Sequence, residues 1–578
     1  MVMTVKEEVF LEHLNKNHSV SEARKIDCDE VSLTQVSQHG QSTFAFKAKV
    51  KDNFFEIVVI VSDEFPRALP DYYLLHPGKH GLMGHVNWRG KICYTTEENL
   101  AIDVDRPLDV LDYTLKKVLD VLESGEKKNL TSLWEEIQGY WQSLPESYIV
   151  YCFFDPGDAV ESIYAQEKKL NGKHIVTCFN KEPCDKEYGF NCSFKKANQI
   201  HALYIPLSTQ INPPLPGQPI TMQFVKDLIS KVAPNNFLKL QQILSRGRHR
   251  KQRLPILFSM PRTSGQKALL GLVLQFRGSI NFITAQSKDI YRIFPLIVQR
   301  HDKKYLLERG GVQQCLAGKC VSIIGCGAVG SRIADLIVHD GIGEVILVDH
   351  DCLQVDNLYR HLLGGSYIGN YKSTALANYF KTKLPYVNIT PEVMRLENWI
   401  KSENYCRTDI VIEATGNITS ARNFNRMIRT SMTTVKPVVY TWLEPYGIGL
   451  HALLTCPPLS GCLECLFTNK GESFLSAVTS FLNPGQHYAK DLVGCGGSFT
   501  DFANAEAARL ALMGRDLAIG FLLNKRNPTY LIYKGDKSQA IAAGLKPSEW
   551  YFTADNAKIL RLENNFLEAT CPLCSGQN

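Results

Sequence analysis

The alternation of apolar strands with helices that begins near Cys320 constrains the fold of this chain more than any other feature. Strands are predicted at residues 321–325, 345–349, 409–414 and 438–442, and helices at 331–339 and 372–384. Such alternation is typical of a mostly parallel sheet covered by helices. The last part of the chain is therefore predicted to be an α/β domain.

The first 300 residues follow other patterns. Three β-rich runs at 42–50, 54–61 and 72–75 precede a helix predicted at 107–122, which together predict a compact α+β unit. Residues 145–300 mix strand-like runs at 148–154, 200–205 and 269–276 with a helix predicted at 222–232. Because 578 residues suffice for three ordinary domains, we divide the chain into residues 1–145, a middle linker domain of mixed structure at 146–304, and residues 305–578.

A glycine loop joins the first strand of the α/β domain to its first helix. Gly325, Gly327 and Gly330 form the pattern G-x-G-x-x-G, in which glycines let the backbone approach phosphates at a helix N-terminus. Asp349 ends the next strand about 20 residues later, where a carboxylate can accept ribose hydroxyls. On these features alone, the chain could equally be an oxidoreductase that binds a nicotinamide or flavin cofactor.

Four polar residues after that strand favour a different chemistry. Asp351, Asn357, Arg360 and Lys372 supply a carboxylate, an amide and two cations close to the expected phosphates. An adenylating enzyme needs such groups, because the attack of a carboxylate on an α-phosphate builds charge that cations and Mg²⁺ must stabilise. The alternative is that they are ordinary surface charges.

The runs Gly325–Ser331, Val348–Asp351 and Asn357–Arg360, together with Lys372, resemble the ThiF/MoeB and ubiquitin-activating enzyme superfamily over roughly residues 305–578. The resemblance implies a Rossmann-like domain that binds ATP and Mg²⁺ and adenylates the C-terminal carboxylate of a protein. In one departure, Gly416 stands where the family usually has an acidic residue, so Asp351 or Glu413 is expected to compensate. Arg309 is the candidate for the family's arginine before the glycine loop.

Cysteines suggest a metal site and a nucleophile. Two C-x-x-C pairs predict a structural zinc site; the alternative is four reduced thiols. Its ligands would be Cys462, Cys465, Cys571 and Cys574. The candidate thioester cysteine of the activating domain is Cys495, because flanking glycines permit an exposed loop and a helix that begins near Asp501 could stabilise a thiolate. Cys456 is the second candidate.

Cys93 follows Gly90, Lys91 and Ile92 in a polar loop, with His85 and Asn87 just before it. An asparagine amide can donate to the oxyanion of a tetrahedral intermediate. With the proline-rich turn at residues 65–70, this framing resembles ubiquitin-conjugating enzymes over about residues 1–145. The resemblance implies that Cys93 is the acceptor thiol and Asn87 the oxyanion donor.

Two parts of this second site depart from the family pattern or lack a fixed role. Val86 replaces the usual motif proline, and the short spacing from His85 to Cys93 leaves the role of His85 open. Asp103 and Asp105 lie beyond Cys93, where a carboxylate could orient or deprotonate a lysine amine.

A conjugating-type domain, a middle domain and an activating domain in one chain resemble the fused activating–conjugating enzymes of bacterial antiphage CBASS operons. The resemblance implies adenylation of the C-terminus of a cGAS-like nucleotidyltransferase (CD-NTase), relay through thioesters and ligation to lysines of target proteins. It also implies a homodimer. The alternatives are a sulfur-carrier activating enzyme fused to an inert module, an oxidoreductase and a non-enzymatic scaffold.

Charge and composition restrict the partners. A net charge of +6, from 64 basic and 58 acidic residues, gives little reason to expect nucleic acid. The basic cluster at residues 245–253 lacks interleaved aromatics and is interpreted as a solvated loop. The acidic N-terminus and the lack of long apolar runs predict no signal peptide and no membrane span. Seventeen cysteines are then expected to be reduced, in the cytoplasm.

Overall fold

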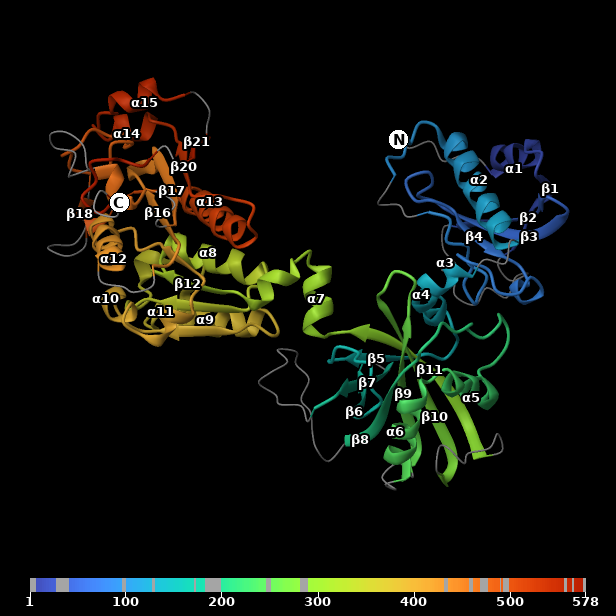
Figure 1. Cartoon of the computed structure of the whole chain (residues 1–578). Coiled ribbons are helices and arrows are strands. Elements are labelled where there is room, and N and C mark those ends of the chain that lie inside the picture. The colour runs from blue at the N-terminus through green and yellow to red at the C-terminus, as the bar shows by residue number, and fades with distance from the viewer. Residues whose placement is uncertain are drawn as a thin grey trace. The chain divides into compact units, whose positions relative to one another are not determined.

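The computed structural model of the chain divides into two compact units, which are described separately. The first comprises residues 1–183 and 193–302, and the second residues 184–192 and 303–578. The structure describes residues 7–27, 41–95, 100–126, 130–170, 173–181, 199–245, 251–280, 289–430, 435–456, 461–467, 477–488, 490–491, 498–499, 501–555, 559–563 and 566–574. Figure 1 shows the elements of both units.

The first unit begins with a four-stranded antiparallel sheet in the order β1-β2-β3-β4. Its strands are β1 (Val20–Lys25), β2 (Gln41–Val50), β3 (Asn53–Ser62) and β4 (Asp71–Leu74). The helices α1 (Glu7–Lys16) and α2 (Pro107–Glu126) belong to the same part of the chain. Alternate residues of β2, such as Phe44 and Phe46, face a core shared with Phe10 of α1 and Leu115 of α2, because side chains of a strand point to opposite faces in turn.

A closed barrel follows, with strand order β10-β11-β5-β7-β6-β8-β9. The strands are β5 (Tyr148–Cys152), β6 (Glu161–Leu170), β7 (Lys173–Phe179), β8 (Gln199–Pro206), β9 (Lys251–Pro261), β10 (Lys267–Ile280) and β11 (Ile290–Arg300). Ala202 and Tyr204 of β8 pack in one core, while Leu203 and Ile205 pack in another that includes the helices α5 (Met222–Ser230) and α6 (Pro234–Ser245). The strand runs and the helix predicted in the middle domain coincide with β5, β8, β10 and α5, but the sequence patterns did not indicate closure into a barrel.

Two short helices, α3 (Thr131–Glu135) and α4 (Ile137–Gln142), join the sheet domain to the barrel. Ile137 and Trp141 of α4 are buried in the core on the outside of the barrel, and the Trp141 Nε1–H donates to the Gly271 carbonyl oxygen of β10 at 3.1 Å. The segment that follows the N-terminal sheet domain therefore packs against the outside of the barrel.

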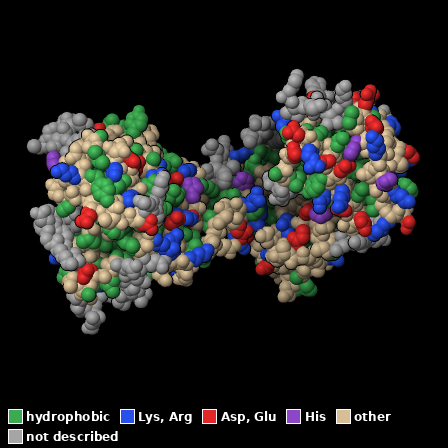
Figure 2. Space-filling model, turned by 90° about the horizontal axis from the view of Figure 1, so that it is seen from above, with side chains coloured by type: hydrophobic (Ala, Val, Ile, Leu, Met, Phe, Trp, Pro, Cys, Tyr) green, Lys and Arg blue, Asp and Glu red, His purple; other side chains and the backbone are tan. Residues whose placement is uncertain are grey.

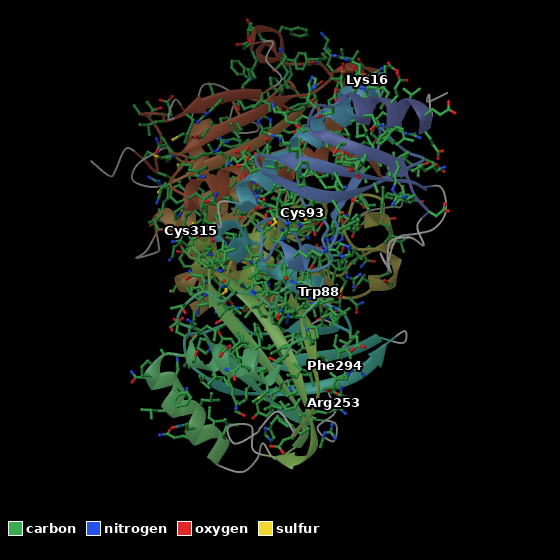
Figure 3. The ribbon with its side chains drawn as sticks, turned by 90° about the vertical axis from the view of Figure 1, so that its right-hand side faces the viewer. Lys16, Trp88, Cys93, Arg253, Phe294 and Cys315 are labelled. Carbon is green, nitrogen blue, oxygen red and sulfur yellow. The ribbon has the colours of Figure 1, made fainter. Side chains whose placement is uncertain are left out.

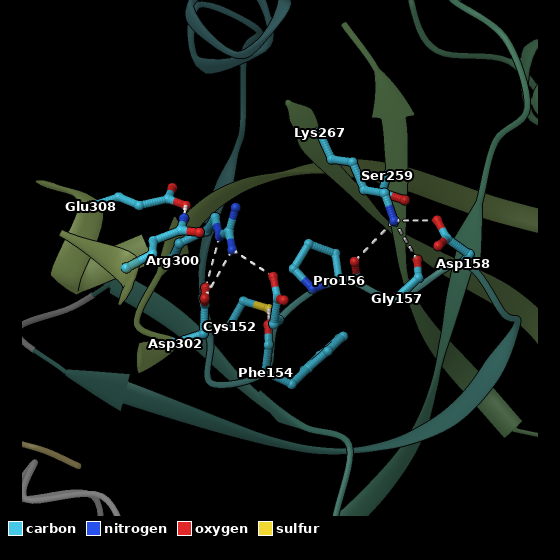
Figure 4. A network of polar contacts seen from close by, with 12 residues as sticks. Cys152, Phe154, Pro156, Gly157, Asp158, Ser259, Lys267, Arg300, Asp302 and Glu308 are labelled. Carbon is cyan, nitrogen blue, oxygen red and sulfur yellow. Dashed lines mark hydrogen bonds and ion pairs between the residues drawn. The ribbon is translucent and has the colours of Figure 1, made fainter. Parts of the chain in front are cut away.

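Ion pairs and a hydrogen bond hold the segment that follows β5 in place. Arg300 at the end of β11 pairs with buried Asp302 (2.7 Å) and with Asp155 (3.1 Å), and Lys267 of β10 donates to the Gly157 carbonyl oxygen at 2.9 Å and pairs with Asp158 (Figure 4). These contacts attach residues 155–158 to two strands of the barrel, β10 and β11.

The second unit is built on an eight-stranded sheet in the order β14-β13-β12-β15-β16-β17-β20-β21. The first five of these strands are parallel, and the last three pair antiparallel. The strands are β12 (Cys320–Ile324), β13 (Glu344–Val348), β14 (Ile389–Glu392), β15 (Ile410–Glu413), β16 (Val438–Leu443), β17 (Gly449–Thr455), β20 (Thr529–Lys534) and β21 (Ile559–Glu563), and a separate hairpin pairs β18 (Lys490–Asp491) with β19 (Ser498–Phe499).

Helices cover both faces of this sheet. The helices of this unit are α7 (Lys303–Arg309), which has no buried residue, α8 (Ala328–His339), α9 (Lys372–Lys383), α10 (Leu396–Trp399), α11 (Glu403–Arg407), α12 (Ile418–Thr430), α13 (Asn504–Leu522), α14 (Ser538–Ala542) and α15 (Glu549–Thr553). Ile323 of β12 packs on one face with Ile333 of α8 and Leu517 of α13, whereas Ile324 packs on the other face with Phe424 of α12. A sheet buried on both faces explains why these strands read as continuous apolar runs.

Charges of both signs are interspersed over the face of the molecule shown in Figure 2. None of the helices in the described part of the chain combines the length and apolar character that a membrane span requires.

We expect Trp141→Ala to destabilise the first unit by roughly 3–5 kcal/mol, because the change leaves a large cavity and removes the hydrogen bond to the Gly271 carbonyl oxygen. Hydrogen exchange of barrel amides in increasing urea would measure the loss. Trp134→Ala is the matched control, since Trp134 is only partly buried. Equal losses in the two variants would contradict the role given to Trp141.

Candidate functional site

The Cys93 loop is a small hairpin held against the sheet of the first unit. Its backbone pairs internally, with the Cys93 N–H donating to the His85 carbonyl oxygen at 2.7 Å and Val86 forming an antiparallel bridge with Ile92. The Ile92 N–H also donates to the Tyr72 carbonyl oxygen of β4 at 2.8 Å. Cys93 itself is exposed, as the acceptor role predicted for it requires, and Figure 3 labels its side chain.

Asn87 closes the turn of this hairpin. Its Oδ1 accepts hydrogen bonds from the backbone N–H groups of Arg89 (2.9 Å) and Lys91 (3.0 Å). The amide Nδ2 is thereby left to donate elsewhere, so the geometry is compatible with the oxyanion role predicted for Asn87.

Ser143, just beyond α4, anchors the hairpin to the middle of the chain. The Trp88 N–H donates to the Ser143 Oγ at 2.9 Å, and the Arg89 Nε donates to the Ser143 carbonyl oxygen at 3.0 Å. Trp88 also packs against the hydrophobic core on the outside of the barrel. The reactive loop and the barrel are thus joined within the first unit.

Glu136, between α3 and α4, was not singled out by the sequence patterns. Its Oε2 lies 2.9 Å from Nδ1 of His85, and this hydrogen bond raises the pKa of His85. Nothing in the sequence marks a glutamate 43 positions after Cys93, since only the fold brings the two segments together. Asp103 and Asp105 are exposed, and within the described residues neither bonds to the Cys93 hairpin.

Three charged groups surround the Cys93 thiol. Partial burial raises its pKa most, the carboxylates of Glu136 and Asp71 raise it further, and the Lys91 ammonium lowers it. Lys91 in turn pairs with Asp71, with Nζ 2.7 Å from Oδ1. Cys93 is therefore mostly a thiol, not a thiolate, at neutral pH in the free enzyme.

The glycine loop of the second unit lies where β12 ends and α8 begins. Gly325 has φ +86°, and a Cβ there would lie 2.8 Å from the Ala414 backbone, while a Cβ on Gly330 would lie 1.8 Å from the Gly325 carbonyl oxygen. No atom lies within 4 Å of a Cβ built on Gly327. The loop thus packs tightly on two sides and leaves space at Gly327, at the N-terminus of a helix that favours a phosphate.

Two buried side chains hold this loop by its backbone. Asp349 accepts hydrogen bonds from the N–H groups of Cys326 (2.7 Å) and Asp351 (2.8 Å). His361 bonds the Cys326 carbonyl oxygen through Nε2 at 2.8 Å and accepts the Leu363 N–H at Nδ1. Because Nδ1 accepts, Nε2 carries the proton, and burial lowers the pKa of His361 and keeps it neutral.

Asp349 therefore supports the loop in addition to any contact with ribose. His361 was missed by the sequence analysis, although it directly follows Arg360 in the motif that carried the resemblance.

Asp351 and Lys372 meet at the opening of the site, with Nζ 3.2 Å from Oδ2. Asp351 is half-exposed and its ligand atoms lie within 4.8 Å of those of Asp349 and His350. Glu413 is buried, accepts the Thr415 N–H at 3.1 Å, and has its pKa raised by that burial to about 7. An exposed carboxylate suits Mg²⁺ better than a buried one whose pKa is raised, so the geometry favours Asp351 over Glu413 as the ligand.

The other predicted cofactor residues have local partners. Asn357 accepts the Gln354 N–H at 3.1 Å and so caps the short 3₁₀ helix Val355–Asn357. The guanidinium of Arg360 lies 5.2 Å from the ring centre of Phe502. Arg309 is exposed at the end of α7.

The four cysteines predicted to bind zinc lie together, although more than 100 residues separate the two C-x-x-C pairs. Their sulfurs lie 3.8 Å apart for Cys462 and Cys571, 3.6 Å for Cys465 and Cys574, and 3.6 Å for Cys462 and Cys574. A tetrahedron of sulfurs at about 2.3 Å from zinc has edges of about 3.8 Å. The donor set and its spacing fit a structural zinc ion.

Cys495 lies outside the described residues, in a segment between the paired strands β18 and β19. Cys456, the second candidate, is half-buried at the end of β17, and burial raises its pKa. After β19, the Asp501 carbonyl oxygen accepts the Tyr446 N–H at 2.7 Å.

Glu444, at the end of β16, anchors the chain ahead of that hairpin. This buried carboxylate accepts hydrogen bonds from the N–H groups of Phe481 (2.8 Å) and Leu482 (3.1 Å), from the Ser480 Oγ (2.6 Å), and from His451 Nε2 (2.9 Å). Both ends of the region that contains Cys495 are therefore attached to the turn at residues 444–446.

Charge substitutions around Cys93 should change its reactivity in opposite directions. Glu136→Gln removes a carboxylate that disfavours the thiolate, so we expect several-fold faster alkylation by iodoacetamide at pH 8. Lys91→Met removes a cation that favours the thiolate, so alkylation should slow. Mass spectrometry of the Cys93 peptide would give both rates, and a change of the same sign in the two variants would contradict this electrostatic picture.

Comparisons with known proteins place both reactive regions in families. Residues 21–150 match the model of prokaryotic E2 family B, and residues 299–497 match that of the ThiF family. The ATP-dependent ubiquitin transferase-like protein Cap2 of Pseudomonas aeruginosa is 22% identical over 517 residues, which cover 86% of this chain and 88% of Cap2.

Two further similarities are limited to part of the chain. The sulfur carrier protein ThiS adenylyltransferase of Escherichia coli is 26% identical over 180 residues, or 30% of this chain and 68% of that protein. Among solved structures, E. coli MccB is 17% identical with a TM-score of 0.32, over 45% of this chain and 68% of that one.

The two family-model matches confirm the predicted fold classes of the N-terminal and C-terminal domains, and with the similarity to Cap2 they confirm the resemblance to the fused enzymes of CBASS operons. The similarity to Cap2 runs through both matched regions and the barrel between them. The chain is therefore an enzyme that is similar over most of its length to the fused E1/E2-like proteins, with an E2-like region and a ThiF region in one polypeptide.

Proposed function

We propose that this enzyme uses ATP and Mg²⁺ to adenylate the carboxyl end of a protein, carries the acyl group as thioesters on its own cysteines, and ligates it to lysine amines of target proteins. The observation that carries the proposal is the exposed Cys93 thiol in a hairpin of the E2-like domain, in the same polypeptide as a glycine-loop site with Asp351 and Lys372 at its opening.

The resemblance to CBASS enzymes makes the C-terminus of a cGAS-like nucleotidyltransferase the proposed substrate. A homodimer and a cytoplasmic location belong to the same proposal. None of the thirteen cysteines in the described part of the chain forms a disulfide, which supports a reducing compartment.

At the adenylation site, a substrate carboxylate would attack the α-phosphate of ATP and release pyrophosphate. The amides at the start of α8 would bind phosphate oxygens, held in place by Asp349 and His361. Lys372 would stabilise the charge that develops on the phosphate, and Asp351 would hold Mg²⁺, which supplies further neutralisation when bound. The acyl group then passes to Cys495 and on to Cys93, so that one difficult amide synthesis becomes several easier transfers.

Nonreducing gels of enzyme, ATP, Mg²⁺ and a candidate cGAS-like nucleotidyltransferase would test the relay. We expect a thiol-sensitive adduct on the wild-type enzyme, an adduct that stays on the activating domain in Cys93→Ser, and no adduct in Cys495→Ser. Cys315→Ser, which changes another exposed thiol, is the matched control. An adduct that forms equally in all variants would rule out the cysteine relay.

Lys372→Ala should lower ATP–pyrophosphate exchange by about 10²-fold or more, because it removes a cation from the developing phosphate charge. Asp356→Ala is the control, since Asp356 is exposed in the neighbouring 3₁₀ helix and is not part of the proposed site. Exchange that survives Lys372→Ala unchanged would place the chemistry elsewhere.

Zinc should be present in the purified enzyme at about one ion per chain. Cys571→Ser should abolish it, because a tetrahedral thiolate site loses most of its affinity with one ligand. Atomic emission would measure the metal, and Cys406→Ser, an exposed cysteine of α11, should leave the zinc content unchanged. Full zinc content in Cys571→Ser would exclude this site.

The partial match to ThiS adenylyltransferase keeps a second candidate function, a sulfur-carrier activating enzyme with an inert E2-like module. That candidate predicts full activity in Cys93→Ser. The exposure of Cys93 and the match to the E2 family model over residues 21–150 support the conjugating function instead.

A further inference from the structure

The His85–Glu136 pair beside Cys93 has no part in the relay described above. The Cys93 N–H bonds the His85 carbonyl oxygen at 2.7 Å, which makes the two residues partners across the hairpin. His85 also has φ +61°, in the left-handed region that residues other than glycine seldom adopt. Such backbone strain persists where the surrounding structure fixes it, often at reactive sites.

The hydrogen bond to Glu136 decides which ring nitrogen of His85 is basic. Nδ1 lies 2.9 Å from the Glu136 carboxylate, which can only accept, so Nδ1 carries a proton. Nε2 then has the free lone pair in the neutral ring, and it has no hydrogen-bond partner within the part of the chain that is described. The side chain is 37% exposed, so an incoming amine can reach it.

The charges that act on the Cys93 thiol beside this pair come from three parts of the first unit, and Glu136 is the charge that acts on His85. Lys91 belongs to the hairpin, Asp71 to β4 and Glu136 to the connection between α3 and α4, and Arg89 is held by its bond to Ser143. The carboxylates Asp103 and Asp105, the other candidates for a base, make no hydrogen bond to the hairpin among the described residues.

We propose that His85, oriented by Glu136, is the general base that removes the proton from the lysine amine attacking the thioester on Cys93. The proposal rests on the conjugating function proposed above. It goes beyond that function because it names the group that activates the acceptor amine.

The proposed step balances in protons and electrons, with His85 and Cys93 as the two groups of the enzyme that gain and lose the proton. The amine nitrogen forms a bond to the thioester carbonyl carbon, and its proton moves to His85 Nε2. The carbon–sulfur bond breaks with its electron pair on Cys93 Sγ, and the imidazolium, stabilised by Glu136, returns the proton to that sulfur. The products are an amide and the free thiol.

The electrostatics fit both proton transfers. Glu136 raises the pKa of His85, which makes the imidazole a stronger base near neutral pH. The raised pKa of Cys93 favours protonation of the departing sulfur.

The test measures discharge of the Cys93 thioester alone. A glycine-terminated peptide thioester of mercaptoethanesulfonate loads Cys93 in the full-length enzyme without ATP, and aminoacetonitrile, a weakly basic amine that is unprotonated across the neutral range, discharges it. Loading and discharge are followed by intact mass at a series of pH values, with Cys93→Ser to identify the loaded site.

We expect the wild-type discharge rate to fall as pH drops through the pKa of His85. Glu136→Gln should shift that midpoint to lower pH and reduce the plateau rate, and His85→Gln should remove the inflection and lower the rate by about 10²-fold. Glu135→Gln is the matched control, because Glu135 is the residue next to Glu136 and accepts a hydrogen bond from Ser264 instead of His85. It should leave the pH dependence of the discharge rate unchanged.

A Glu136→Gln enzyme that discharges more slowly with the same pH midpoint would overturn the inference, since that result indicates only a structural role for Glu136. An unchanged His85→Gln profile would overturn it as well. If a folded wild-type enzyme fails to load Cys93 at all, the conjugating function fails with it, so the two failures are distinguishable.

Discussion

Hydrogen bonds from side chains to loop backbone hold both reactive regions of this enzyme in shape. Asn87 closes the Cys93 hairpin by accepting two backbone N–H groups, and Asp349 does the same for the glycine loop. Loops lack the repeating bonds of helices and strands, so their polar backbone needs such partners. These bonds therefore fix the backbone beside Cys93 and that of the glycine loop.

The same principle extends to the segment that contains Cys495. Glu444 binds the chain before it through Phe481 and Leu482, and the turn that follows Glu444 binds the chain after it through Asp501. Because a buried carboxylate needs several donors, this arrangement satisfies Glu444, and it attaches Phe481, Leu482 and Asp501 to the turn at residues 444–446.

The sequence predicted the parts of each site that lie close together in the chain. The predicted strands and helices of the ThiF domain coincide with β12, α8, β13, α9, β15 and β16 within a few residues, because strands buried on both faces leave clear apolar runs. The two C-x-x-C pairs were recognised from local spacing, and the structure brings them together. The roles of Cys93, Asn87, Arg360, Lys372 and Cys495 stay predictions.

Other contributions depended on residues that approach only in the fold. Glu136 reaches His85 because α3 and α4 pack on the barrel, and Ser143 reaches Trp88 for the same reason. Closure of the barrel was also absent from the local patterns, since β5 pairs with β11 across about 140 residues. Sequence periodicity by itself determined the type of the predicted elements and the motifs between them, because these depend on side chains that are neighbours along the chain. The tertiary structure alone decided the charge around Cys93, because electrostatic interactions depend on distance in space and not on position along the chain.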